Sequence, residues 1–161
     1  MQECTSATLK QAATASLGKT DQAGTWPMFI NQPQEGVALD HFVTEDGEQF
    51  AGTHLIADMW DVERIDDLEY METALRQAVS AAGATLLHIH LHHFTPGGGI
   101  SGVAVLAESH ISVHTWPERK FAAFDIFMCG NCKPEKGLEV LRRAFSPGRE
   151  EIQEYKRGRV K

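Results

Sequence analysis

The sequence has few cysteines, no long apolar run and fewer basic than acidic residues. Three cysteines in 161 residues (Cys4, Cys129 and Cys132) are too few for a disulfide framework. No apolar stretch could cross a bilayer, and the start lacks the basic and apolar segments of a secretory signal. A formal net charge of −7 argues against nucleic acid or an anionic membrane as the main partner. These absences predict a reduced, cytoplasmic protein.

The composition that remains fits one globular domain behind a polar leader. A length of 161 residues predicts about one domain, and 42% apolar residues are enough for one core. Residues 1–25 are rich in Thr, Ser, Ala, Gln and Gly, which is typical of a flexible segment. We therefore expect a flexible N-terminal extension over residues 1–45 and a folded domain over residues 46–161. The acidic run Glu45–Glu48 predicts a turn.

Hydrophobic periodicity predicts a mixed fold. A helix is expected from Asp66 or Asp67 to about Ala82, with Leu68, Met71, Leu75, Ala78, Val79 and Ala82 on one face. A second helix is expected over 135–145, with Leu138, Leu141 and Phe145 facing inward. Strands are predicted at 53–60, 85–94, 100–106 and 121–128, with a further one around 152–155. Helices separated by runs of strands predict an α+β two-layer sandwich, with a mostly antiparallel sheet and both helices packed on one face.

A polar cluster lies between the predicted strands 100–106 and 121–128. A glycine run precedes these strands, and a cysteine follows the second of them. The cluster offers nucleophile, base and acid candidates near one pair of strand ends. Its members are Glu108, Ser109, His110, Ser112, His114, Thr115 and Glu118.

The stretch GISGVAVLAESHISVHTWPE, followed by FMCG, resembles the processing region of the prokaryotic S-adenosylmethionine decarboxylase proenzymes. The resemblance extends more loosely from about Ala51 to the end of the chain. It implies the same α+β architecture and a pyruvoyl-dependent enzyme that cleaves itself. It also implies decarboxylation of S-adenosylmethionine to the aminopropyl donor for spermidine synthesis. A homodimer of processed protomers is implied too, with sites near the interface and no need of metal or pyridoxal.

The resemblance assigns the cleavage to the bond between Glu108 and Ser109, which would leave a β chain of residues 1–108 and an α chain of residues 109–161. Ser109 would become the pyruvoyl group, whose carbonyl forms a Schiff base with the substrate amine. His114 would transfer protons during processing. Positions five apart in a straight strand face opposite sides, so Ser109 and His114 can meet only if a bulge or turn lies between them.

Four further residues take roles from the resemblance. Ser101 would support processing, and Cys129 would donate a proton to the carbon that loses CO₂, which suits a thiol with a pKa near the working pH. Phe94 would stack on the adenine if the glycine loop carries one extra residue. Glu118 would accept hydrogen bonds from the ribose hydroxyls. Trp116 is interpreted as a packing residue.

Each of these residues also has a structural interpretation, and two clusters suggest metal binding. Cys129 and Cys132 form a CxxC pair, but a tetrahedral zinc site needs two more ligands and no second pair exists. Cys132 receives no role. His88, His90 and His92 would share one strand face, where a metal site is possible and a polar sheet face or a subunit interface is favoured.

Two rival functions remain open at this stage. One is an arginine or ornithine decarboxylase on the same scaffold. Phe94 and Glu118 argue against it, because a basic amino acid has no adenine or ribose for them to contact. The other is a binding or regulatory module that no longer processes itself, or a His/Cys metal-binding domain. The intact set of Ser109, His114 and Cys129 weighs against lost activity.

Overall fold

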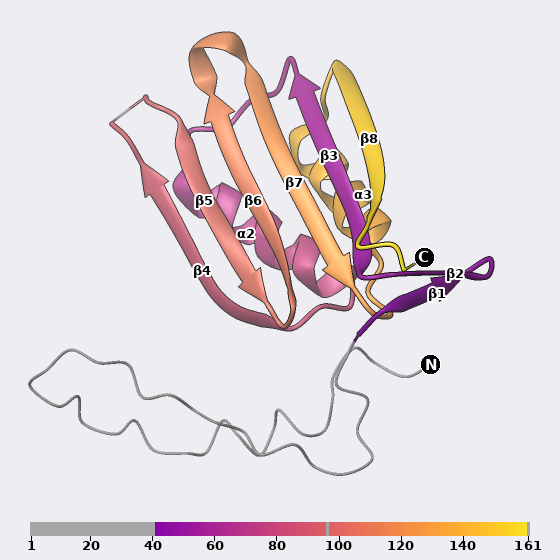
Figure 1. The fold of residues 1–161 in the computed structure, drawn as a ribbon. Coiled ribbons are helices and arrows are strands. Elements are labelled where there is room, and N and C mark those ends of the chain that lie inside the picture. Colours follow the sequence, from indigo (N-terminus) through magenta and orange to yellow (C-terminus); the bar gives the residue numbers. More distant parts are fainter. Residues whose placement is uncertain (1–40, 96, 161) are drawn as a thin grey trace, which may run out of the picture. The chain divides into compact units, whose positions relative to one another are not determined.

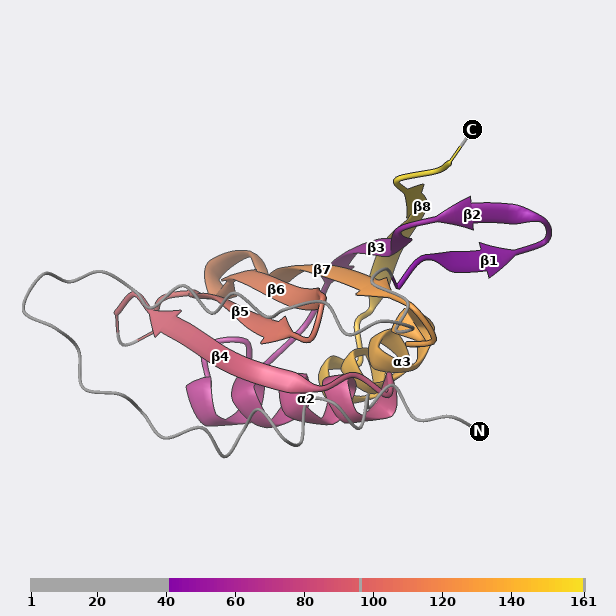
Figure 2. The same cartoon turned by 60° about the horizontal axis from the view of Figure 1, so that its bottom comes forward.

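The computed structural model describes residues 41–95 and 97–160, which form two layers (Figure 1). One layer is a six-stranded antiparallel sheet in the order β4-β5-β6-β7-β3-β8. Its strands are β3 (Gly52–Trp60), β4 (Leu86–His93), β5 (Ile100–Leu106), β6 (Ser109–Trp116), β7 (Phe121–Cys129) and β8 (Arg149–Arg157). The other layer holds α2 (Leu68–Ala81) and α3 (Pro134–Phe145), which cover the same face of the sheet (Figure 2). The predicted α+β two-layer sandwich is confirmed.

Both helices begin and end at residues that the sequence marks. The Asp67 carboxylate accepts a hydrogen bond from the Tyr70 amide at 2.9 Å and caps α2. Gly83 follows the end of that helix with φ of 74°. Glycine adopts this left-handed conformation at little energetic cost, because it has no Cβ. The predicted inward residues are buried except Leu68, the first residue of α2, which is 39% exposed.

The prediction was wrong for residues 109–116, which form the central strand β6 rather than a polar connection. Strand β6 pairs with β5 on one side and β7 on the other. Its apolar side chains Ile111 and Val113 are fully buried under the helices, while His110, Ser112 and His114 face the other way. A polar-apolar alternation of this kind is typical of a half-buried strand. The last strand, β8, is also longer than the predicted 152–155.

The sheet face opposite the helices carries polar and aromatic side chains; we call it the open face. His88, His90 and His92 lie together on it, with His93 on the other side, as the alternation predicted. Further members include His54, Asp125, Phe127, Trp116 and Tyr155. No helix of the described residues is long and apolar enough to span a membrane.

A small hairpin of β1 (Val43–Glu45) and β2 (Glu48–Phe50) precedes the sheet. Its turn at Asp46 and Gly47 confirms the turn predicted there. Residues 1–40 lie outside the described residues, so the N-terminal extension and its boundary at residue 45 stay predictions.

Candidate active site

Glu108, Ser109 and Cys129 meet where β6 begins and β7 ends; we call this group the Ser109 end. The Ser109 side chain is buried, with 7% exposure. Its hydroxyl oxygen accepts a hydrogen bond from the Cys129 amide at 3.1 Å. The Cys129 thiol in turn donates to the Glu108 carbonyl oxygen at 3.2 Å. A hydroxyl, a thiol and the carbonyl of the peptide bond before that hydroxyl are therefore held together.

The backbone at Glu108 is strained. Leu106 pairs with Ser109, so Ala107 and Glu108 alone make the turn between β5 and β6. Glu108 has φ of 62°, in the left-handed region that a residue with a side chain rarely adopts. Such a conformation costs about 1–3 kcal/mol and persists only where its surroundings hold it. The strained residue is the one that supplies the carbonyl of the Glu108–Ser109 bond.

The environment of Cys129 favours its protonated form. Burial raises the pKa of the Cys129 thiol, and the negative charge of Glu108 raises it further, while the hydrogen bond with Ser109 acts in the opposite direction. The close approach of β3 contributes to this burial. Gly52 pairs with Cys129, and a Cβ at residue 52 would lie 3.1 Å from the Cys129 sulfur and 2.4 Å from the Met128 carbonyl oxygen. A protonated thiol can donate a proton near neutral pH.

Ser101, His114, Phe94, Trp116 and Glu118 gather at the opposite end of the same strands; we call this group the His114 end. The Ser101 hydroxyl and the His114 Nδ1 are 2.8 Å apart, across the pair of β5 and β6. Phe94, directly after β4, is 60% exposed. Glu118 is exposed in η1 (Pro117–Arg119), the short 3-10 helix that follows β6. These residues offer an aromatic face, a carboxylate and a Ser-His pair.

The structure does not bring Ser109 and His114 together. Both belong to β6, whose pairing with β5 runs without a register shift from Ser109 to His114. The bulge or turn that a direct contact requires is therefore not present in this strand. Five residues of extended strand span about 16 Å, and the two side chains point to opposite faces. Ser101 pairs with His114, so it also lies far from Ser109.

Trp116 is more exposed than the packing interpretation suggests. Its side chain is 41% exposed on the open face. Its ring stacks on Phe121 with centroids 5.3 Å apart, and the centroid of the His114 ring lies 6.3 Å away. Its place in strand alternation with His114 could have indicated this exposure.

A polar network on the open face was not singled out from the sequence. The Ser112 hydroxyl donates to Asp125 Oδ2 at 2.8 Å, and Asp125 Oδ1 lies 3.5 Å from His54 Nε2. Arg157 Nη1 lies 3.1 Å from the other ring nitrogen of His54. Burial lowers the pKa of His110, and the neighbouring His54 lowers it further. Both effects favour the neutral form of the His110 imidazole, which faces the open side of the sheet.

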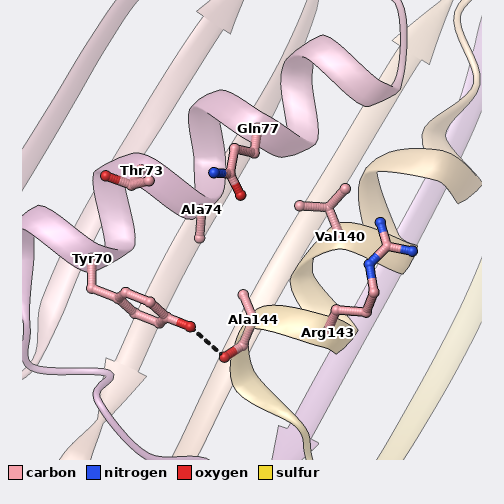
Figure 3. Close-up of a pocket in the computed structure, with 7 residues that line it drawn as sticks. All are labelled: Tyr70, Thr73, Ala74, Gln77, Val140, Arg143 and Ala144. Carbon is pink, nitrogen blue, oxygen red and sulfur yellow. Dashed lines mark hydrogen bonds between the residues drawn. The ribbon is translucent and has the colours of Figure 1, made fainter.

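No metal cluster of three or more His, Cys, Asp or Glu side chains occurs within residues 41–95 and 97–160. Cys132 is buried beside the start of α3. A groove of about 300 Å³ lies between the two helices (Figure 3). It is lined by Tyr70, Thr73, Ala74, Gln77, Val140, Arg143 and Ala144, and the Tyr70 hydroxyl donates to the Ala144 carbonyl at 2.7 Å. None of the predicted site residues lines this groove.

Comparison with known proteins matches the folded part of the chain. The family model of S-adenosylmethionine decarboxylase matches residues 53–158. The S-adenosylmethionine decarboxylase proenzyme of Thermomicrobium roseum is 44% identical over 68% of this chain and 95% of its own. That of Methanococcus aeolicus is 46% identical over 66% of this chain and 93% of its own. A crystal structure of the adenosylmethionine decarboxylase from Aquifex aeolicus aligns with a TM-score of 0.61 and 34% identity, over 68% of this chain and 92% of that one.

The two-layer fold and these matches define a decarboxylase of the α+β class. The chain belongs to the S-adenosylmethionine decarboxylase family. This confirms the resemblance read from the motif around Glu108 and Ser109.

Proposed function

We propose that this chain is an S-adenosylmethionine decarboxylase proenzyme that cleaves itself between Glu108 and Ser109. The observation that carries the proposal is the hydrogen-bonded group of Ser109, Cys129 and the strained Glu108 peptide. The names of the relatives support S-adenosylmethionine as the substrate over arginine or ornithine. The exposed ring of Phe94 and the carboxylate of Glu118 also suit a nucleoside better than a basic amino acid.

Cleavage begins when the Ser109 hydroxyl attacks the carbonyl carbon of Glu108. The new C–O bond replaces the amide C–N bond, which leaves an ester and a free amine on Ser109. The Cys129 thiol donates to the oxygen on which negative charge develops, and the Cys129 amide holds the attacking oxygen. Breaking this peptide also releases the left-handed strain at Glu108.

The ester is then broken by elimination. A base removes the α-proton of Ser109, the bond between Cβ and Oγ breaks, and the Glu108 carboxylate leaves. The remaining dehydroalanine takes up water and loses ammonia, which makes residue 109 a pyruvoyl group. The cut lies in the turn, so the paired segments that end at Leu106 and begin at Ser109 hold both new chains in one sheet.

The residues around Ser109 fit a pyruvoyl cofactor at that position. Such a group supplies a carbonyl that acts as the electron sink for loss of CO₂. Burial raises the pKa of the Cys129 thiol and so favours its protonated form. This thiol lies beside Ser109 and is placed to return a proton to the substrate carbon. The Ser109 side chain is only 7% exposed, which limits the contact of this residue with bulk water.

We further propose that the working enzyme is a homodimer whose sites combine both ends of the sheet. Ser101 and His114 cannot reach Ser109 within one chain, because β6 runs straight between them. A second copy, packed against the open face with its strands reversed, would bring its His114 end to the first copy's Ser109 end. By symmetry the same contact would form twice, giving two sites per dimer. A cytoplasmic location is inferred from the sequence alone.

Intact-mass spectrometry of the purified protein beside Ser109→Ala tests the cleavage. We expect two fragments from the wild type, residues 1–108 with an ordinary carboxyl terminus and residues 109–161 blocked by a pyruvoyl. Ser109→Ala should stay as one chain. A folded wild-type protein that remains uncut would refute the proposal and favour a binding module. Release of CO₂ from S-adenosylmethionine, arginine and ornithine then identifies the substrate.

A further inference from the structure

His41 lies against the Ser109 end although it precedes the matched family region, residues 53–158. Its main chain is fixed there, because its carbonyl oxygen accepts a hydrogen bond from the Gly130 amide at 2.8 Å. Gly130 directly follows Cys129 and has φ of 59°. A Cβ at residue 130 would lie 3.6 Å from the His41 Cβ, so the two segments are in close contact.

The imidazole of His41 reaches the side chain of Glu108. Its Nε2 lies 3.0 Å from the Glu108 Oε1, with the two side chains 47% and 53% exposed. An exposed ion pair of this kind contributes little to global stability. The position of this ion pair is more important than its strength, because it involves Glu108, the residue with the strained backbone. The contact acts on the residue that carries the carbonyl attacked in the proposed cleavage.

Three contacts hold the Glu108–Ser109 peptide in place. The pair of Leu106 and Ser109 fixes the turn, and the Cys129 thiol holds the carbonyl oxygen. The third contact, from His41, holds the side chain. A free Glu108 side chain would let the backbone rotate from φ of 62° toward the more common negative values, and the carbonyl would turn away from the thiol. Fixing the carboxylate opposes that rotation.

We propose that His41 is a positioning residue for self-cleavage, supplied by the segment ahead of the family domain. It binds the carboxylate of Glu108 and keeps the Glu108 carbonyl in line with the Cys129 thiol and the Ser109 hydroxyl. This inference rests on the proposed cleavage between Glu108 and Ser109. The segment that joins the N-terminal extension to the domain therefore takes part in maturation.

The test follows the rate of cleavage in freshly synthesised protein, with four variants. His41→Ala removes the contact and should slow cleavage about two- to fivefold, the range of an exposed ion pair acting on a rate. His41→Gln keeps an N–H donor of similar reach and should restore most of the rate. In a Glu108→Ala background, His41→Ala should cause no further loss, because residue 108 then has no side-chain acceptor and the contact is already broken. Arg76→Ala, which removes an exposed ion pair with Glu72 on α2, is the matched control and should cleave normally.

The outcomes separate this inference from the proposed function. Normal cleavage of His41→Ala, or an equal loss in the Glu108→Ala background, would overturn the role of His41 while leaving self-cleavage intact. Equal slowing in His41→Ala and Arg76→Ala would also overturn it, since general destabilisation would then be the cause. A wild-type chain that is never cut would overturn both. The thermal midpoint of each variant, measured beside the rate, should stay at the wild-type value.

Discussion

The two ends of the central strands differ in how complete they are. At the Ser109 end, a nucleophile, a thiol and a strained carbonyl are in direct contact within one chain. At the His114 end, a Ser-His pair and exposed aromatic rings face outward, with Phe94 60% and Trp116 41% exposed. One end holds a hydroxyl and a thiol against its own backbone carbonyl. The other offers surfaces that a second molecule can contact.

This difference follows from the way in which a strand spaces its residues. Ser109 and His114 are five residues apart in sequence, yet an extended strand places them about 16 Å apart and on opposite faces. A group of polar residues along one strand therefore cannot form one compact site. If Ser109 and His114 cooperate, they do so across two copies of the chain.

The largest effect expected from this arrangement is the recovery of decarboxylase activity when two inactive variants are combined in one dimer. Ser109→Ala and His114→Ala should each lose activity by about 10²-fold or more, because one lacks the nucleophile and the other the proton carrier. When the two are co-expressed in equal amounts, half of the dimers are mixed, and each mixed dimer has one intact site of two. Decarboxylation should therefore return to about a quarter of the wild-type level.

A matched pair of variants makes that experiment decisive. Ser109→Ala and Cys129→Ala both damage the Ser109 end, so their mixed dimers contain no intact site and should stay inactive. Recovery in this control pair, or none in the first pair, would contradict a site shared between copies. The mixed dimers can be confirmed by differently tagged chains purified together.

The sequence allowed correct prediction of the parts of the fold that alternate apolar and polar residues strongly. Strand β5 was predicted at its observed bounds, and the Asp67 cap set the start of α2. Strand β6 was missed because His110, Ser112 and His114 lie on the open face, where polar residues replace the apolar side chains that mark a buried strand. The alternation of the apolar residues Ile111 and Val113 with these polar residues was the pattern that indicated a strand.

The chemical roles of the predicted site residues stay predictions, while the structure gives the distances between them. The motif resemblance supplied Ser109, Cys129 and His114, but only the strand geometry separates His114 from the other two. His41 could not be predicted, because its contact with Glu108 joins segments far apart in the chain and leaves no periodic pattern. Contacts between isolated loop residues depend on the folded backbone, which local sequence patterns do not specify.

Thr115 tests whether the His114 end can be weakened without affecting the Ser109 end. Its buried hydroxyl donates to the Ile65 carbonyl at 2.8 Å and accepts from the Ile100 amide at 2.7 Å. Thr115→Val leaves both buried groups without a partner and should lower the free energy of unfolding by about 1–3 kcal/mol. Chemical denaturation in the uncleaved Ser109→Ala background measures this, since a single chain then unfolds.

The exposed Thr73 on α2 provides the control for this change. Thr73→Val should alter the unfolding free energy by about 0.5 kcal/mol at most, because its side chain is exposed. The alkylation rate of Cys129 should be the same in all these proteins if the two ends are independent. Faster alkylation in Thr115→Val would mean that the ends are coupled through β6.

The smallest expected effect concerns the Cys129 thiol and the charge of Glu108. Burial and the Glu108 carboxylate both raise the pKa of this thiol, so Glu108→Gln should lower that pKa. A lower pKa forms the reactive thiolate at lower pH, and the alkylation profile of Cys129 should shift toward lower pH. In the wild type the raised pKa should keep the thiol protonated, and decarboxylation active, until the pH rises through that pKa. Mass spectrometry of the Cys129 peptide after timed alkylation, in the Ser109→Ala background, measures the profile.

Glu118→Gln removes the same charge at the His114 end and serves as the comparison. Within one chain this carboxylate is too far from Cys129 to affect its pKa through screened solvent. A dimer that joins the two ends brings the partner's His114 end close, and Glu118→Gln should then lower the pKa of Cys129 in the dimer alone. The pKa of Cys129 should therefore be measured in both variants at protein concentrations where the chain is monomeric and where it is dimeric. Like complementation, this measurement tests whether the two ends meet in a dimer, but it follows a pKa instead of activity. An unchanged profile for Glu108→Gln at every concentration would contradict the effect of the Glu108 charge on the pKa of the thiol.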